Sequence, residues 1–264
     1  MKIILVNKVH YLKGGSETYY FGLAEGLKTL GHEVHFFAME GPDNIPCEDS
    51  DLFVSSKDYN GPSSLSQKVS AATSLIYSKE AREKFQALCE RVQPDVVHMN
   101  LVHRQITLSI LDAPYLKQHK VPVLFTSHDY ILVCPNYVML DGAGEVCDAC
   151  LGGHFTNCLK RKCVKDSTAK SGMGMLEAEY LKLHGSYRKI DCIVAPSQFM
   201  RSKLLEGGLP TQQVIYMQNF AKQEILDNAK DGTDRTDRDN PYLLFFGRLS
   251  SEKGVDILVD AFIK

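Results

Sequence analysis

Three features that would mark a secreted, membrane-spanning or nucleic-acid-binding protein are missing from the sequence. No apolar run reaches the roughly 20 residues that cross a bilayer, and the opening MKIILVNKVH is too soon interrupted for a signal peptide. The formal net charge is −2, from 30 basic and 32 acidic side chains, so a strongly basic face for nucleic acid is not expected. We therefore expect a cytoplasmic protein that binds no nucleic acid.

Apolar runs alternate with segments of helical periodicity along residues 1–220. Strands are predicted at 3–6, 34–38, 96–99, 121–127, 192–195 and 214–218, and helices at 20–30, 65–92, 105–118, 168–190 and 198–206. The helix at 105–118 is expected to be broken or bent near Pro114. Alternation of this kind is typical of β-α-β units, which place parallel strands between layers of helices. The pattern predicts an α/β protein with a doubly wound, Rossmann-like parallel sheet.

The chain changes character after residue 220. Residues 221–240 hold ten charged side chains and few strongly apolar ones, which is the composition of a polar linker. Residues 241–264 then predict a strand at Tyr242–Phe246, a basic turn and an amphipathic helix. One strand and one helix cannot bury a core alone, so we interpret 241–264 as the incomplete start of a second domain.

Polar and glycine residues follow several of the predicted strands. Gly14-Gly15, His98, His128-Asp129 and Ser197 all stand where a strand ends, and doubly wound sheets bind ligands at those ends. Each is also compatible with a tight turn or a hydrogen-bonded structural residue. The glycine turn is not G-x-G-x-x-G, so the nicotinamide fingerprint is missing there.

Taken in order, these segments resemble family-4 glycosyltransferases of the two-Rossmann-domain (GT-B) type. KGGSETYYFGLAEGLKTLGHEV resembles the GGxE…LaxxLxxxGHeV start of that family, and PDVVHMN at 94–100 resembles its PDvvHxH strand end, with Asn100 in place of a second histidine. His128-Asp129 resembles the HD motif, and SQF at 197–199 resembles the turn before the last helix of the domain. Asn219 resembles the Asn of the hinge motif pNG, and 247–254 resembles GRL…EKG.

The resemblance implies a hexosyltransferase-type enzyme of polysaccharide biosynthesis. It would move a sugar from a nucleotide-diphosphate sugar to a glycan or a lipid-linked acceptor, with retention and without a catalytic metal. Residues 1–220 would form the acceptor-side domain and 241–264 the start of the donor-binding domain. The paired glutamates of the family would lie downstream of Lys264, so we expect this chain alone to be inactive.

The resemblance also implies roles for single residues. His128 would donate a hydrogen bond to a sugar hydroxyl or to the departing phosphate, and Asp129 would fix the tautomer of its ring. The other implied sites are Gly14, Gly15, Arg248 and Lys253 at the donor, and Glu17, His98, Ser197 and Asn219 at the acceptor or in the cleft. Arg248 and Lys253 would neutralise the leaving diphosphate.

Residues 134–163 interrupt the alternation and contain five of the eight cysteines. The spacing Cys147-x2-Cys150-x7-Cys158-x4-Cys163 can close a tetrahedral structural zinc site. Cys134 and His154 are alternative ligands, and an iron–sulfur cluster or unligated thiols stay open. The following LKRKCVK at 159–165 could meet an anionic lipid-linked acceptor or the inner face of the membrane, or form a solvated basic face.

Two other functions therefore remain as alternatives to a glycosyltransferase. The cysteine-rich segment, together with the missing donor half, is compatible with a zinc-stabilised binding domain that catalyses nothing. The predicted fold class is also compatible with a nicotinamide-linked oxidoreductase, although the glycine motif of that class is absent.

Overall fold

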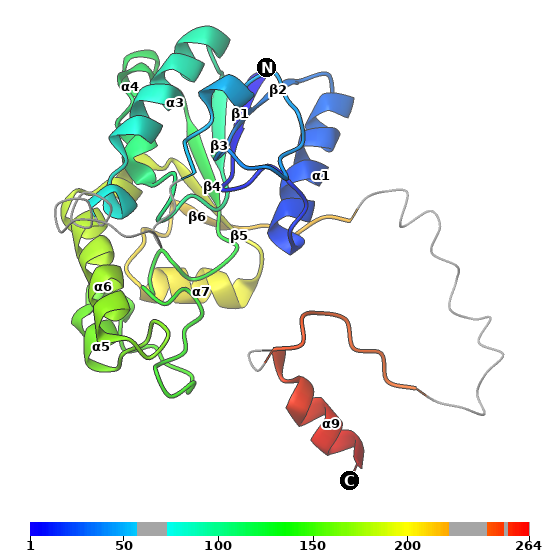
Figure 1. Cartoon of the computed structure of the whole chain (residues 1–264), viewed down its shortest axis with the longest axis vertical. Helices are drawn as coiled ribbons and strands as arrows, with labels where there is room; N and C mark the ends of the chain where they lie inside the picture. The colour runs from blue at the N-terminus through cyan, green and yellow to red at the C-terminus, as the bar shows by residue number, and fades with distance from the viewer. Residues whose placement is uncertain (57–72, 222–241, 251–252, 264) are drawn as a thin grey trace. The chain divides into compact units, whose positions relative to one another are not determined.

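The computed structural model describes residues 1–56, 73–221, 242–250 and 253–263. The chain divides into two units, Met1–Phe220 and Ala221–Lys264. The linker predicted at 221–240 lies outside the described residues except for its first residue. Figure 1 traces the chain from the N-terminus to the C-terminus.

A six-stranded parallel sheet is the framework of the first unit. Its strand order is β2-β1-β3-β4-β5-β6, and every neighbouring pair is parallel. The strands are β1 (Lys2–Val6), β2 (Glu33–Phe37), β3 (Val96–Met99), β4 (Val123–Thr126), β5 (Cys192–Ala195) and β6 (Val214–Tyr216). The chain runs outward from β1 to β2 and then returns to β3 on the other side of β1. The strand order therefore reverses between β1 and β3, where doubly wound folds bind their ligands.

Helices cover both faces of this sheet (Figure 1). Those with described bounds in the first unit are α1 (Gly15–Thr29), α3 (Lys79–Val92), α4 (Pro114–His119), α5 (Thr156–Lys160), α6 (Thr168–Leu183) and α7 (Gln198–Glu206). Short 3-10 helices stand at Ser50–Leu52, Leu108–Asp112, Leu151–Gly153 and Ser186–Lys189. Successive side chains of a strand point to opposite faces, and β1 shows the result. Ile4 and Val6 belong to the core that contains α3, whereas Ile3 and Leu5 belong to the core that contains α1. The predicted doubly wound sheet is confirmed.

Serine, proline and glycine set three helix boundaries, of which the sequence predicted the break near Pro114. The helix predicted at 65–92 lies partly outside the described residues, and its described part is interrupted at 77–78, where Ser78 is the N-cap of α3. The helix predicted at 105–118 is divided into a 3-10 helix, Leu108–Asp112, and α4, which begins at Pro114. Proline fits the first turn of a helix, where its missing N–H has no partner to lose. The helix predicted at 168–190 ends at Leu183, and Gly185 follows with φ 66°. A left-handed residue of this kind stops a helix.

The second unit differs from the prediction at its strand. Residues 242–250 are described and contain no strand, while α9 (Val255–Ile263) forms as predicted. A strand exists through hydrogen bonds to a neighbouring strand, and the described part of this unit offers no partner. No residue of α9 is buried.

Candidate active site

The polar residues that follow β1, β3 and β4 gather at the carboxyl edge of the sheet. A cavity of about 320 Å³ opens there, and we call it the cleft. It is lined by Lys8, Leu101, Val102, His103, Arg104, Asp129, Ile131 and Tyr137. Asp129 is the member of this lining that the sequence motifs predicted. Lys8 and Arg104 were missed, although Lys8 stands two residues after β1 and could have been found by its position.

His128 is held by Asn100. The ring Nε2 lies 2.9 Å from Asn100 Oδ1, and the Asn100 side chain is buried with its amide Nδ2 donating to the Val6 carbonyl. The Asn100 oxygen is therefore the acceptor, and Nε2 of His128 carries the donated hydrogen. This leaves the lone pair on Nδ1. Asn100, which replaces the second histidine of the family motif, thus fixes the tautomer of the ring.

Asp129 does not have the role that the motif implied for it. Its Oδ1 accepts a hydrogen bond from the backbone N–H of Ile131 at 3.0 Å, and Ser127 Oγ donates to its backbone carbonyl. Burial lowers the pKa of His128 to about 4, so the ring is neutral at pH 7. A neutral ring whose Nε2–H is committed to Asn100 can accept a hydrogen bond through Nδ1, from a sugar hydroxyl for example. It is poorly suited to donate one to a phosphate.

His98 lies beneath the site and not in the lining of the cleft. It is buried, and its Nε2 lies 2.7 Å from Thr126 Oγ1, which is also 3.3 Å from the hydroxyl of Tyr19. The Tyr19 ring meets His128 edge to face, with 5.1 Å between ring centroids. Burial, with a smaller contribution from His128, lowers the pKa of His98 to about 4. His98 is therefore placed to support Thr126 and Tyr19 behind His128.

The predicted glycine turn leads directly into α1. Gly14 is the N-cap with an extended backbone, and a Cβ added at Gly15 would meet nothing within 4 Å. Glu17 is buried, with its Oε1 accepting from Asn7 Nδ2 at 3.3 Å and its Oε2 accepting from Ser16 Oγ at 3.0 Å. The Glu17 carboxylate thus ties the first turn of α1 to the loop after β1.

Ser197 and Asn219 occupy different surroundings. Ser197 caps α7, its Oγ accepting from the N–H of Met200 at 3.0 Å, so its hydroxyl serves the helix. Asn219 is exposed beyond β6. Phe220, which replaces the glycine of the hinge motif, packs on Tyr19 with ring centroids 5.2 Å apart, and a Cβ added at Gly22 would meet its ring at 3.1 Å. Gly22 therefore provides the space that Phe220 fills.

Two cations and a carboxylate give the cleft its electrostatic character. Burial raises the pKa of Asp129, and Arg104 and Lys8 oppose this shift by attraction. Burial, followed by repulsion from Lys13 and Arg104, lowers the pKa of Lys8. The cleft therefore holds charged groups of both signs in a partly desolvated space, which is suited to a polar, hydroxyl-rich ligand.

Arg248 and Lys253 belong to the second unit, and both are exposed. The Ser250 N–H donates to the Arg248 carbonyl at 3.0 Å, and the Lys253 N–H donates to the Ser250 carbonyl at 2.9 Å. These backbone hydrogen bonds keep Arg248 and Lys253 near one another within the second unit. In the parts of the chain described above, no helix is long and apolar enough to cross a membrane.

Five thiols line one small cavity in the cysteine-rich segment. Cys147, Cys150, Cys158 and Cys163 are joined there by Cys134. Burial raises the pKa of Cys150 and of Cys158 to about 12, so without a cation these thiols keep their protons. As placed, the described residues include no group of three or more His, Cys, Asp or Glu side chains arranged to hold a metal ion.

The fold and the position of the cleft define a Rossmann-like domain with a cavity at its switch point, where doubly wound folds bind their ligands. The family model "Glycosyltransferase Family 4" matches residues 13–221. The chain belongs to this family, which confirms the resemblance seen in its motifs.

Known proteins similar to the chain are longer than it is. An "Uncharacterized 42.6 kDa protein in cps region" of Klebsiella pneumoniae is 26% identical over 269 residues, covering 97% of this chain and 63% of that protein. UDP-N-acetylglucosamine 2-epimerase from Rickettsia bellii is 12% identical, with a TM-score of 0.43 over 86% of this chain and 47% of that one. The lipopolysaccharide outer core galactosyltransferase WaaB is 11% identical, with a TM-score of 0.38 over 81% and 44%. The family assignment rests on the family model.

Proposed function

We propose that the protein represented by this chain is a retaining glycosyltransferase of polysaccharide biosynthesis, of the hexosyltransferase type. It transfers a sugar from a nucleotide-diphosphate sugar to a glycan or a lipid-linked acceptor. The observation that carries the proposal is the group of polar residues at the carboxyl ends of the strands of a family-4 domain. Asp129 lines the cleft together with Lys8 and Arg104, and the neighbouring His128 is hydrogen-bonded to Asn100.

The first unit would supply the acceptor side of the reaction. His128 accepts a hydrogen bond from a sugar hydroxyl through Nδ1, which Asn100 leaves unprotonated. Asp129 lines the cleft with a raised pKa and is suited to receive the proton that the acceptor hydroxyl loses. Glu17 and His98 support the residues around this site through their hydrogen bonds to Asn7 and Thr126.

The second unit would supply the cations of the donor side. Arg248 and Lys253 neutralise the diphosphate as it leaves, which is electrostatic stabilisation of developing charge and requires no catalytic metal. The described part of this unit has no buried residue in α9, so it forms no enclosed donor pocket. We therefore expect the 264-residue chain to bind donor weakly and to turn over none by itself.

The test uses a protein that contains this chain and has the length of the Klebsiella pneumoniae relative. Donor hydrolysis and sugar transfer are both assayed. Arg248→Ala and Lys253→Ala should each lower kcat/KM by about 100-fold or more, since both act on charge that develops in the transition state. The exposed Lys160→Ala is the matched control, because it removes an equal charge outside the cleft lining. Full activity in the Arg248 and Lys253 variants would overturn the proposal.

A second comparison isolates the contact between His128 and Asn100. Asn100→Leu keeps the branched shape of the side chain but removes the acceptor of the Nε2 hydrogen. We expect it to lower kcat by about tenfold or more, because the ring can then adopt the other tautomer. His128→Ala in the same background should add little to the loss, since both changes remove one contact. Independent, additive losses would contradict the role given to Asn100.

We also propose a structural zinc in the cysteine-rich segment, with Cys147, Cys150, Cys158 and Cys163 as its ligands. The five thiols around one cavity support it. The buried thiols would lose their protons on binding zinc, because a bound metal cation stabilises thiolates and so lowers their pKa. Cys134 lines the same cavity and is an alternative ligand. The thiols must turn toward a common point to close the site.

A further inference from the structure

A second cavity, distinct from the cleft, lies against helix α6. It has a volume of about 350 Å³, at the lower end of the 300–1,000 Å³ range that is usual for small-molecule sites. We call it the α6 pocket. Its lining is Leu75, Ile76, Arg104, Val164, Lys165, Ala169, Lys170, Met173, Gly174 and Glu177.

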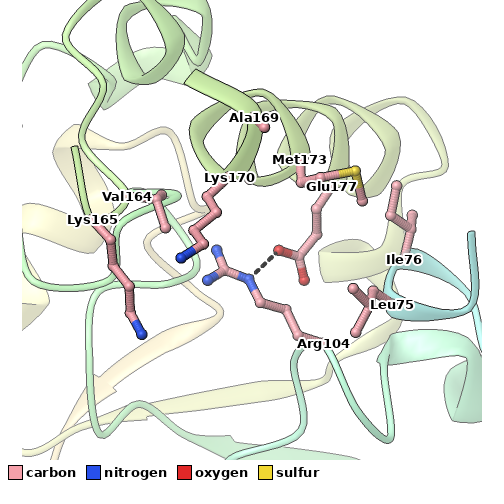
Figure 2. A pocket seen from close by; sticks show the side chains of 10 residues that line it. Leu75, Ile76, Arg104, Val164, Lys165, Ala169, Lys170, Met173 and Glu177 are labelled. Atoms are coloured by element: carbon pink, nitrogen blue, oxygen red, sulfur yellow. Dashed lines mark hydrogen bonds and ion pairs between the residues drawn. The ribbon is translucent and has the colours of Figure 1, made fainter. Parts of the chain in front are cut away.

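The interior of the α6 pocket is apolar, and its charged side chains carry a net positive charge. Leu75, Ile76 and Met173 belong to its apolar lining (Figure 2). Of its four charged side chains, Glu177 is paired with Arg104, whose Nε lies 2.8 Å from Glu177 Oε2. Lys165 and Lys170 are exposed, and they leave the pocket with two positive charges beyond that pair. A hydrophilic neutral glycan matches neither the apolar interior nor the cationic rim.

Arg104 lines both the α6 pocket and the cleft. Figure 2 shows its guanidinium directed into the pocket, beside the amine of Lys170. A hydrogen bond from Nη2 to the Pro135 carbonyl fixes the same side chain to the start of the cysteine-rich segment. The apolar pocket is therefore adjacent to the proposed acceptor site, with one fixed cation common to both.

We propose that the α6 pocket binds the hydrocarbon chain of a phosphate-bearing lipid acceptor. The phosphate lies against Lys165 and Lys170, and the hydroxyl-bearing end of the same molecule occupies the cleft. Apolar contacts bind the hydrocarbon chain of the lipid, and the two lysines attract its phosphate, as basic side chains do for anionic lipid head groups. This inference rests on the proposed function and selects the lipid-linked acceptor over the free glycan.

The first experiment measures lipid binding by the 264-residue chain, without any activity assay. The chain is titrated calorimetrically with dodecyl phosphate below its micellar concentration, and separately with inorganic phosphate and with dodecyl maltoside. We expect saturable binding of one dodecyl phosphate, at least about tenfold tighter than either other probe. Equal binding of inorganic phosphate would indicate an anion site only, and equal binding of dodecyl maltoside an apolar site only. Either result overturns the proposal, as does no binding.

Three variants locate the binding site. Ala169→Trp fills the pocket from an exposed position of α6, so the variant should fold normally, as a thermal melt would show. It should weaken the binding of dodecyl phosphate by about tenfold or more. The double variant Lys165→Glu, Lys170→Glu should weaken it similarly. Lys160→Glu is the matched control, an exposed lysine of the same basic run outside the pocket lining. An equal effect of the control, or no effect of Ala169→Trp, overturns the assignment.

A last measurement separates this inference from the proposed function. In the longer protein, Ala169→Trp should reduce transfer to a lipid phosphate acceptor by about tenfold while donor hydrolysis is retained. If the unmodified protein does not hydrolyse the donor, the proposed function is contradicted, but the result of the lipid-binding experiment is unaffected. If Ala169→Trp leaves transfer to the lipid unchanged, lipid binding in the α6 pocket is contradicted, whereas the proposed function is not.

Discussion

Arg104 and Glu177 form an ion pair that joins two separate segments of the first unit. Arg104 belongs to the irregular loop after β3 and has a positive φ of 68°, whereas Glu177 lies in α6. The Arg104 Nε donates to Glu177 Oε2 at 2.8 Å, and the Glu177 side chain is only 7% exposed. Burial raises the pKa of Glu177, while the charge and hydrogen bond of Arg104 lower it. The pair holds α6 against the wall of the cleft.

Removing one partner should cost more than removing both. Arg104→Gln leaves the Glu177 carboxylate buried without its cation, and we expect a loss of roughly 3 kcal/mol in the free energy of unfolding at pH 7.5. The folded-state pKa of Glu177 then rises further above its unfolded value. The penalty is therefore present at high pH and shrinks as protonation neutralises the group toward pH 5.

Chemical denaturation at several pH values measures this penalty. Adding Glu177→Gln to Arg104→Gln replaces the uncompensated charge by a neutral amide and should recover part of the loss at pH 7.5. A double variant no more stable than the single one, or a penalty independent of pH, would show that the pair does not act through charge.

The sequence was sufficient to predict the sheet and part of the site. The strands carry continuous apolar runs because both faces of the sheet are covered, and Ile3 to Val6 are all buried. Parallel strands end at the same edge of a sheet, so His98 and His128 were expected to lie near one another. The contact of His98 with Thr126 and that of His128 with Asn100 are compatible with that arrangement.

Side-chain partners and loop residues could not be predicted in the same way. Whether His128 meets Asn100 or Asp129 depends on side-chain directions that no motif encodes. Arg104 is positioned by a loop with a left-handed backbone, which has no periodicity to read. The strand expected at Tyr242–Phe246 depended on a neighbouring strand, and an apolar run alone does not form one.

The cysteine-rich segment should contain zinc, and its stability should depend on that metal. Elemental analysis of the purified chain is expected to give one zinc per chain. A strong chelator should lower the melting temperature by about 5–10 °C, because binding free energy contributes directly to folding. Cys150→Ser should lose the metal, whereas Cys47→Ser, outside the thiol-lined cavity, should retain it. A metal-free protein whose melting is unaffected by the chelator would contradict the site.

The buried His98 should make the first unit sensitive to acid. Burial lowers its folded-state pKa to about 4, below the value of about 6.5 for a histidine in an unfolded chain. Below pH 6.5 the unfolded chain therefore binds a proton that the folded chain does not. The contribution of His98 to stability is complete above that pH and is lost as the pH falls, at up to about 1.4 kcal/mol per pH unit.

Two variants distinguish this titration from the loss of a hydrogen bond. His98→Gln keeps a polar partner for Thr126 but cannot take up the proton, so its free energy of unfolding should fall less steeply than that of the unmodified chain between pH 6.5 and pH 4.5. Thr126→Val removes the partner of the ring, which lies 2.7 Å away, and leaves the imidazole buried. That variant should be less stable at every pH yet keep the steeper slope, because the burial that depresses the pKa is unchanged. Urea unfolding at four pH values measures both slopes, and identical slopes for His98→Gln and the unmodified chain would exclude His98 as the titrating group.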